Sequence, residues 1–304
     1  MVSLLFNLIR KLEKESVLSR KEIVERLQNF HCSFEFLDEI TFCRWANGVT
    51  TPNFYKQLLL ISFFSFPLVN FIEMIDYKIV PKKNRILYDK ILDLFNCYYH
   101  SVSCYEPITS KTITLNYSLL TVSEHWNIFS GFYENVKSKN NIRFMNDTIN
   151  SKVKTYVFSI KNKECILSHT SCIFEANYFL DYLNLSIDDD SDKSVLINVS
   201  YYANSKFFEI LIGNILMHIQ NKVPDVQSLY ILFRGGQFLN FIESSGGKVV
   251  WKEKGNTLIG RAYLIKVEWA EFVSNPIVFN LVKAQLKNYG IVSKLGSIDL
   301  DVLW

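Results

Sequence analysis

The first 66 residues space their apolar side chains as a string of short amphipathic helices does. Leu4, Leu5, Leu8, Ile9 and Leu12 recur three and four positions apart, which predicts a first helix with one buried face. Charged residues between them occupy the other face. The spacing therefore predicts an all-α N-terminal region.

Capping residues predict where the next two helices begin. Ser19 and Glu22 have the spacing of a capping box, in which the Ser hydroxyl accepts the Glu amide and the Glu carboxylate reaches back. A second helix is therefore predicted to run to about Leu27. Asp38 is placed to cap a third helix that continues through Ala46.

Glycine and proline positions predict where the third helix ends and the fourth begins. Gly48 stands where a left-handed residue is needed after a helix. Thr51 and Pro52 predict the next start, with Thr as the cap and Pro at the first helical position. The apolar run 58–69 then continues as a core helix that ends near Pro67.

Beyond residue 94 the hydrophobic period changes to that of strands. Two apolar stretches flank a polar turn and predict a β-hairpin over 154–174. Strands and helices alternate afterwards. The predicted elements are strand 195–202, helix 205–222, strand 229–234, helix 237–245, and strands 248–252 and 258–269. This alternation contains a central β-α-β unit.

The fold class predicted is α+β with two domains, an all-α domain followed by an α/β domain with a central mixed sheet. The sequence VPKKNR at 80–85 combines proline with exposed charge and is the best linker. We predict one domain over 1–70, a helical linker over 71–84 and a second domain over 85–304.

Composition narrows the classes of protein. The chain has 304 residues, of which 49% are hydrophobic and 21% charged, so a largely disordered protein is excluded. The net charge of +3 does not by itself point to a polyanionic partner. The N-terminus does not fit a signal peptide, and the longest apolar run is shorter than the roughly 20 residues of a spanning helix. We therefore expect a cytoplasmic protein with no membrane partner.

One segment carries a family resemblance. DEITFCRWANGVTTP, residues 38–52, resembles the recognition helix and following turn of Xre/Cro helix-turn-helix regulators, and the resemblance extends over about 3–66. The residues that carry it are Thr41, Arg44, Trp45, Asn47, Gly48 and Pro52. The resemblance implies a DNA-binding domain, and it assigns Asn47 a contact to the DNA backbone.

The residue types agree with that resemblance. Phe42 and Trp45 lie three apart and predict the buried face of the helix. Glu39, Thr41 and Arg44 are left to face outward, and a guanidinium at such a position can contact guanine bidentately.

The start of the second helix adds two further candidates. Ser19 and Arg20 there can present an amide and a positive charge to a phosphate. Residues 1–66 hold eight basic and seven acidic side chains, so the general attraction to DNA is small and a homodimer is expected.

The second half resembles a different family. The hairpin, the strand and helix over 195–222 and the segment LYILFRGGQFLNFIESSGGKVVWK are similar to GNAT-type N-acyltransferases. That resemblance implies acetyl-CoA as cofactor, held by a glycine-rich loop, and a tyrosine acid. The corresponding loop, 202–207, has no glycine, and Ile242 stands near the place of the tyrosine.

These two departures leave no catalytic residue assigned in the main interpretation. An enzyme would require substitutes for the missing groups. The candidates are Lys206 or Tyr202 as replacements and Glu243 or Glu209 as a base.

Other groups of residues with ligand-like spacing do not predict a bound metal or phosphate. Cys97, His100 and Cys104 share a predicted helix face, but a fourth ligand is not evident, so packing is favoured over a metal site. The acidic triplet in 188–192 lacks the glycine and the glutamate of a calcium loop. The glycine pairs near 235 and 246 lack the rest of a phosphate-binding motif and are predicted to be turns.

The sequence thus predicts a transcriptional regulator that binds double-stranded DNA as a homodimer. A non-catalytic acyltransferase-like domain would serve dimerisation or the sensing of a small-molecule or protein effector, with no cofactor and no metal. One alternative is an N-acyltransferase that uses acetyl-CoA and is targeted by its helix-turn-helix domain. A third interpretation is a purely structural interaction protein.

Overall fold

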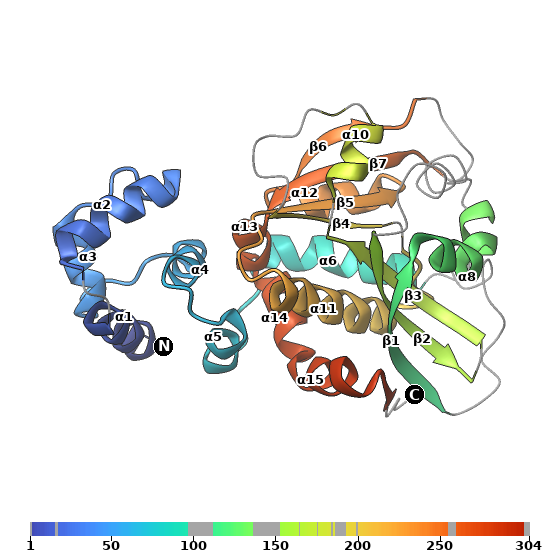
Figure 1. Cartoon of the computed structure of the whole chain (residues 1–304), viewed down its shortest axis with the longest axis horizontal. Helices are drawn as coiled ribbons and strands as arrows, with labels where there is room; N and C mark the ends of the chain where they lie inside the picture. Colours follow the sequence, from blue (N-terminus) through green and yellow to red (C-terminus); the bar gives the residue numbers. More distant parts are fainter. Residues whose placement is uncertain are drawn as a thin grey trace. The chain divides into compact units, whose positions relative to one another are not determined.

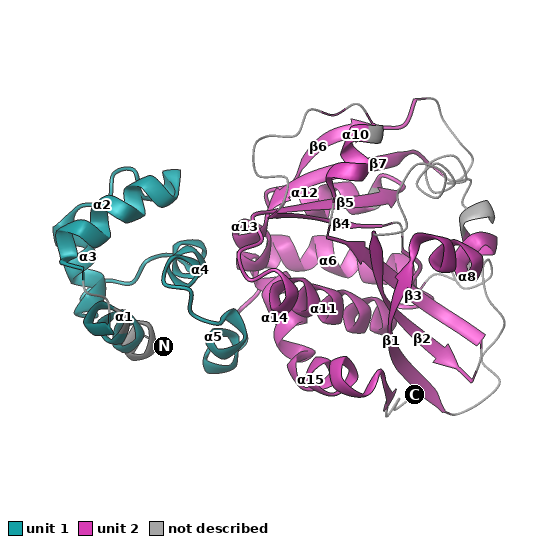
Figure 2. Cartoon of the chain, viewed as in Figure 1, with its two compact units in different colours: residues 1–78 teal, residues 79–304 magenta. Residues whose placement is uncertain are grey.

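The computed structural model describes residues 2–15, 18–96, 112–135, 153–163, 165–174, 176–183, 185, 193–198, 200–254 and 260–300. Within it the chain forms two compact units, residues 1–78 and residues 79–304 (Figure 2). The acidic triplet in 188–192 lies outside the described residues, and so do Cys97, His100 and Cys104.

Unit 1 is all-α. Its helices are α1 (Val2–Glu15), α2 (Arg20–Phe30), the short 3₁₀ helix η1 (Cys32–Phe34), α3 (Glu39–Ala46), α4 (Phe54–Phe63) and α5 (Leu68–Met74). Phe34 and Phe42 are fully buried, and Trp45 is nearly so. The side of α3 predicted to face inward is therefore the buried side.

Local capping chemistry fixes most of the helix starts in unit 1. The Ser19–Glu22 capping box is confirmed, and Asp38 caps α3 by accepting the Thr41 amide at 2.6 Å. Gly48 has the left-handed φ of 70° that was predicted. The predicted start at Thr51-Pro52 is wrong, because Asn53 caps α4 by accepting the Lys56 amide.

Unit 2 is built on an eight-stranded mixed sheet with the order β6-β7-β5-β4-β3-β2-β1-β8 (Figure 1). The strands are β1 (Ile113–Thr121), β2 (Lys154–Asn162), β3 (Cys165–Ile173), β4 (Ser194–Ile197), β5 (Ser228–Arg234), β6 (Lys248–Lys252), β7 (Ala262–Glu268) and β8 (Ser297–Leu300). Strands β4 and β5 run parallel, and the other described pairs are antiparallel. The predicted hairpin is confirmed as β2 and β3.

The helices of unit 2 cover both faces of the sheet. They are α6 (Lys82–Phe95), α8 (Val122–Asn135), α10 (Asn177–Tyr182), α11 (Ser205–Lys222), α12 (Gln237–Glu243), α13 (Trp269–Ser274), α14 (Pro276–Ala284) and α15 (Leu286–Leu295). Val157 of β2 belongs to the core under α8 and α10, whereas the adjacent Phe158 packs against His218 of α11. Neighbouring residues of a strand face opposite sides, so α8 and α11 lie on opposite faces.

The fold class is therefore mixed α+β, as predicted, and α11 has the predicted bounds. Two strand predictions are too long. β4 ends at Ile197 instead of residue 202, and β7 begins at Ala262 instead of residue 258. Strand β1, helices α8 and α10, and the elements after β7 were not predicted from the sequence.

Candidate functional site

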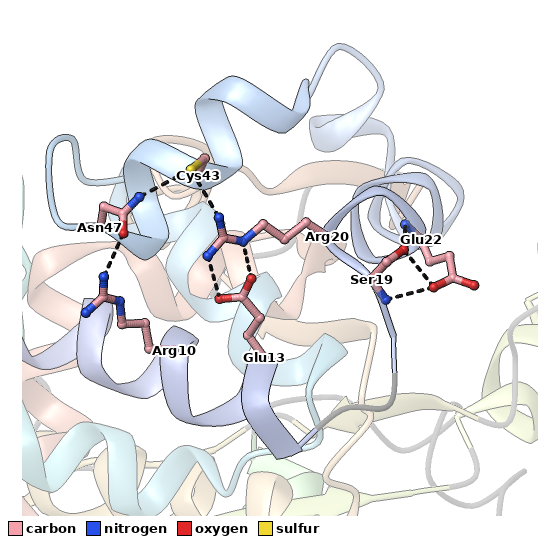
Figure 3. A network of polar contacts seen from close by, with 7 residues as sticks. All are labelled: Arg10, Glu13, Ser19, Arg20, Glu22, Cys43 and Asn47. Atoms are coloured by element: carbon pink, nitrogen blue, oxygen red, sulfur yellow. Dashed lines mark hydrogen bonds and ion pairs between the residues drawn. The ribbon is translucent and has the colours of Figure 1, made fainter.

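Three of the six residues predicted to contact DNA form side-chain hydrogen bonds within unit 1 (Figure 3). Arg20 makes two contacts to the Glu13 carboxylate, and its Nη1 donates to Cys43 Sγ at 3.4 Å. The bond to Glu13 raises the pKa of Arg20. Arg20 thus joins α1, α2 and α3.

Asn47 is bonded in the same way. Its Oδ1 accepts from Arg10 Nη2 at 2.8 Å, and its Nδ2 donates to Cys43 Sγ at 3.2 Å (Figure 3). The Ser19 hydroxyl donates to the Glu22 carboxylate at 2.7 Å. Arg20 and Asn47 therefore connect helices of unit 1, whereas the bond of Ser19 caps the start of α2.

The other three predicted residues lie on α3. Glu39 and Arg44 are exposed and Thr41 is half-buried. Unit 1 carries nine basic and nine acidic side chains, a net charge of zero. A surface of that composition supplies little of the attraction that DNA binding requires.

Unit 2 has a distinct feature where its two parallel strands part. Their pairing ends at Ile197 and Ile231. Beyond that point β5 continues to pair with β7 as far as Arg234, while the chain after β4 stays bonded to β3 through Tyr201 and His169. We call this point the β4–β5 fork. It lies at the carboxyl ends of parallel strands, which is where open α/β sheets bind ligands.

Asn198 stands at the fork as the first residue after β4. Its side chain is buried, with 4% of the residue exposed. The amide Nδ2 donates to Ser171 Oγ at 3.3 Å, but Oδ1 accepts no hydrogen bond. A buried carbonyl without a donor costs about 1–3 kcal/mol, so it marks a place where a ligand N–H group would be stabilised.

Hydroxyl groups line the β4 side of the fork. Thr170 Oγ1 and Ser200 Oγ lie 2.8 Å apart, and the Tyr202 hydroxyl donates to Thr170 Oγ1 at 3.5 Å. Burial raises the pKa of Tyr202, against the opposing effect of its bonds to Ser200 and Thr170. This phenol therefore stays protonated at neutral pH.

The β5 side of the fork is held by a partly buried ion pair. Arg234 Nη1 lies 2.7 Å from Glu253 Oε2 and also donates to the Gly260 carbonyl at 2.6 Å. Glu253 in turn accepts the Ala262 amide. Burial alone would raise the pKa of Glu253, but the bonds from Arg234 and Ala262 and the Arg234 charge lower it below the usual value.

We expect Arg234→Met to destabilise unit 2 by about 2–3 kcal/mol, because it leaves a partly buried carboxylate unpaired. Urea denaturation followed by circular dichroism measures this. Glu253→Gln retains a side-chain acceptor and is the milder comparison variant. Equal midpoints for wild type and Arg234→Met would contradict the role of the pair.

The N-terminus of α11 lies beside the fork, and its first amides are already bonded. Asn204 Oδ1 accepts the Phe207 amide at 2.9 Å, and Asn96 Oδ1 accepts the Ser205 amide at 3.0 Å. Gly213 is the first glycine of α11. The backbone here does not offer the open glycine loop that cradles a diphosphate.

Within the described residues, no group of three or more His, Cys, Asp or Glu side chains is arranged to hold a metal ion. No helix in the same part of the chain is both long and apolar enough to cross a bilayer.

Of the enzyme candidates from the sequence, Tyr202 lies at the fork and Glu209 accepts a hydrogen bond from Tyr88.

Sequence reasoning missed Asn198 and Asn96. An amide directly after the apolar run Val195–Ile197 is the only signal for Asn198. Nothing local marks Asn96, because its partner Ser205 is 109 positions away.

Comparisons with known proteins find similar chains among solved structures. No family model and no curated protein matches it. Among solved structures, it resembles a chimera of the spermidine N-acetyltransferase SpeG from Vibrio cholerae and hSSAT, with 9% identity, a TM-score of 0.32, and 52% of this chain and 98% of that one covered.

Two further structures resemble it at the same level. The aminoglycoside N(6')-acetyltransferase of Legionella pneumophila has 10% identity and a TM-score of 0.32, with 52% of this chain and 94% of that one covered. The CoA-dependent acyl-homoserine lactone synthase MesI has 8% identity and a TM-score of 0.32, with 58% of this chain and 96% of that one covered.

The prediction of a DNA-binding regulator is wrong. The structures that the chain resembles are described as acetyl- and acyl-transferring enzymes, and none of them is described as a DNA-binding regulator. No comparison supports the helix-turn-helix resemblance. In unit 1 itself, Arg20 and Asn47 are bonded to α1, and the net charge is zero.

Proposed function

We propose that unit 2 is an N-acyltransferase that takes an acyl group from a pantetheine thioester, of which acetyl-CoA is one, and passes it to an amine. The observation that carries the proposal is the β4–β5 fork with the unpartnered, buried Oδ1 of Asn198 beside it. Strand order, a β-α-β unit through α11 and the parallel pair agree with the acyltransferase resemblance found in the sequence.

The chemistry of a pantetheine arm suits the fork. The arm is a narrow chain with amide N–H groups, and Asn198 Oδ1 needs such a donor. The apolar residues Ile197 and Ile231 flank the place where the arm would enter. The diphosphate of coenzyme A suits its surroundings less well, because the Ser205 and Phe207 amides are already bonded.

The transfer step follows from ordinary thioester chemistry. The amine nitrogen attacks the carbonyl carbon, the C–N bond forms, and the C–S bond breaks with the electron pair left on sulfur. Tyr202 gives its proton to that sulfur. The proton lost by the new amide nitrogen returns to Tyr202 through the Ser200 and Thr170 hydroxyls, so the products are an amide and a thiol.

Two variants test these roles in an assay of thiol release with acetyl-CoA, S-acetylpantetheine and a panel of primary amines. We expect Tyr202→Phe to lower kcat about 100-fold with little change in KM, because it removes the proton donor. We expect Asn198→Ala to raise the KM of the thioester about tenfold, because it removes the acceptor.

Ser171→Ala is the matched control for Asn198→Ala. It removes the same hydrogen bond to Nδ2 and leaves Oδ1 in place, so its KM should stay near that of the wild type. Absence of thiol release from both thioesters with every amine would overturn the proposed function. Full activity in Tyr202→Phe would overturn the assignment of the acid alone.

A further inference from the structure

The C-terminal end of α6 closes the fork on the α11 side. Phe95, the last residue of α6, is 4% exposed. Its ring packs on those of Tyr202 and Phe208, with centroids 5.3 and 4.8 Å away, and on that of Phe238 of α12 at 5.3 Å. One aromatic ring thus joins the β4 side of the fork to the helix that follows β5.

Asn96 continues this closure at the helix terminus. Its carboxamide oxygen accepts the hydrogen bond of the Ser205 amide at the start of α11. The N-terminus of an 18-residue helix attracts anions through its free amides and its dipole. A neutral oxygen from the same chain therefore takes the place that an anionic group on an incoming ligand would use.

A second bond ties α6 to α11. The Tyr88 hydroxyl donates to Glu209 Oε1 at 2.8 Å, and burial, followed by the Glu209 charge, raises the pKa of Tyr88. This phenol stays protonated and keeps its bond. Phe95 and Asn96 are consequently held at the fork by the helix that carries them.

We propose that Phe95 and Asn96 form a built-in plug that makes the fork select against acyl donors with a diphosphate next to the pantetheine arm. This inference rests on the proposed function. The donor class favoured in the plugged state is a pantetheine thioester whose arm enters the fork without placing two phosphates at the α11 N-terminus. Displacement of Asn96 admits a coenzyme A thioester.

The test compares two substitutions at Asn96, which is exposed, so neither disturbs the core. Asn96→Ala frees the Ser205 amide. Asn96→Asp keeps an acceptor there and adds a negative charge. We expect acetyl-CoA to bind the Ala variant about five- to tenfold more tightly than wild type, and the Asp variant more weakly than wild type.

S-acetylpantetheine is the control ligand, because it has the same arm and no diphosphate. Its dissociation constant, measured by isothermal titration calorimetry on the full chain, should be the same for wild type, Asn96→Ala and Asn96→Asp. A purely structural role for Asn96 would shift the melting temperature of both variants without this opposite effect on acetyl-CoA.

The possible failures are distinguishable. If all three proteins bind S-acetylpantetheine and also bind acetyl-CoA equally, the plug is overturned and the proposed function stands. If none of them binds either thioester, the proposed function is overturned and the plug with it.

Discussion

Gly213→Ala is expected to destabilise unit 2 by about 3 kcal/mol, the upper end of the usual overpacking cost. A Cβ at this position of α11 would lie 2.4 Å from Gln285 Cγ and 2.5 Å from the Leu281 carbonyl oxygen. The carbonyl belongs to the backbone of α14 and cannot rotate away. The two helices would have to separate, which would also disturb the bond between Asn214 Nδ2 and Gln285 Oε1.

Gly131→Ala is the matched control. This glycine lies within α8, and a Cβ there would meet nothing within 4 Å. Alanine should stabilise that helix by about 0.5–1 kcal/mol through its propensity alone. In differential scanning calorimetry, the melting temperature of unit 2 should therefore be about 8 °C lower for Gly213→Ala than for wild type, and slightly higher for Gly131→Ala. Equal transitions for both variants would contradict the close packing of α11 on α14.

Acidification is expected to destabilise unit 2 strongly below pH 6.5. Burial lowers the pKa of His125 to about 3 and, with the Lys222 charge as a lesser cause, that of His218 to about 4. Burial also lowers the pKa of His169 well below its usual value, with a lesser effect from His125. These imidazoles are neutral when folded.

The sign of the effect follows from proton binding. Between the unfolded pKa of 6.5 and the folded values, the unfolded chain binds more protons, so stability is complete above pH 6.5 and is lost as the pH falls. At pH 5 the loss is about 2 kcal/mol each for His125 and His218. Urea midpoints measured from pH 7.5 to 4.5 should therefore fall steeply.

His218→Phe isolates one contribution. The imidazole lies among the rings of Tyr117, Tyr156, Phe158 and Phe174, and its Nε2 has no hydrogen-bond partner. Phenylalanine suits that environment without a charge to gain. The variant should lose less stability than wild type between pH 7 and pH 5, by about 2 kcal/mol. An unchanged slope would contradict a neutral, buried His218.

Features set by neighbouring residues were predictable from the sequence. The capping box at Ser19 and the cap at Asp38 depend on contacts three positions apart, and both are confirmed. The hairpin of β2 and β3 and the full length of α11 follow from hydrophobic period in the same way. The observed start of α4 differs from the predicted one because Asn53, and not Thr51, is the cap. The local sequence pattern allowed both.

Features set by distant partners were not predictable. β8 pairs Leu300 with Ile113 of β1, across nearly the whole of unit 2. The stretch after β4 was predicted as strand from its apolar pattern. Tyr201 does pair with β3, but the loss of β5 as a neighbour leaves no local trace in the sequence. The fork therefore became visible only with the sheet.

The same limit explains the functional prediction. Arg20 was expected to face DNA because it lies at the start of a helix, and Asn47 because of the family resemblance. Their α1 partners, Glu13 and Arg10, could not be identified from helical spacing. Tyr202 was named as a substitute in the alternative enzyme, and it lies at the fork. Asn198 was missed because an amide at a strand end has many ordinary uses.

The most direct test of the proposed function is a crystal structure of the protein with S-acetonylpantetheine, a thioether that cannot transfer its acyl-like group. We expect the arm to lie between β4 and β5 beyond Ile197 and Ile231, with an amide nitrogen at hydrogen-bond distance from Asn198 Oδ1. An unaltered fork at saturating ligand, or binding only elsewhere on the protein, would contradict the assignment of this site.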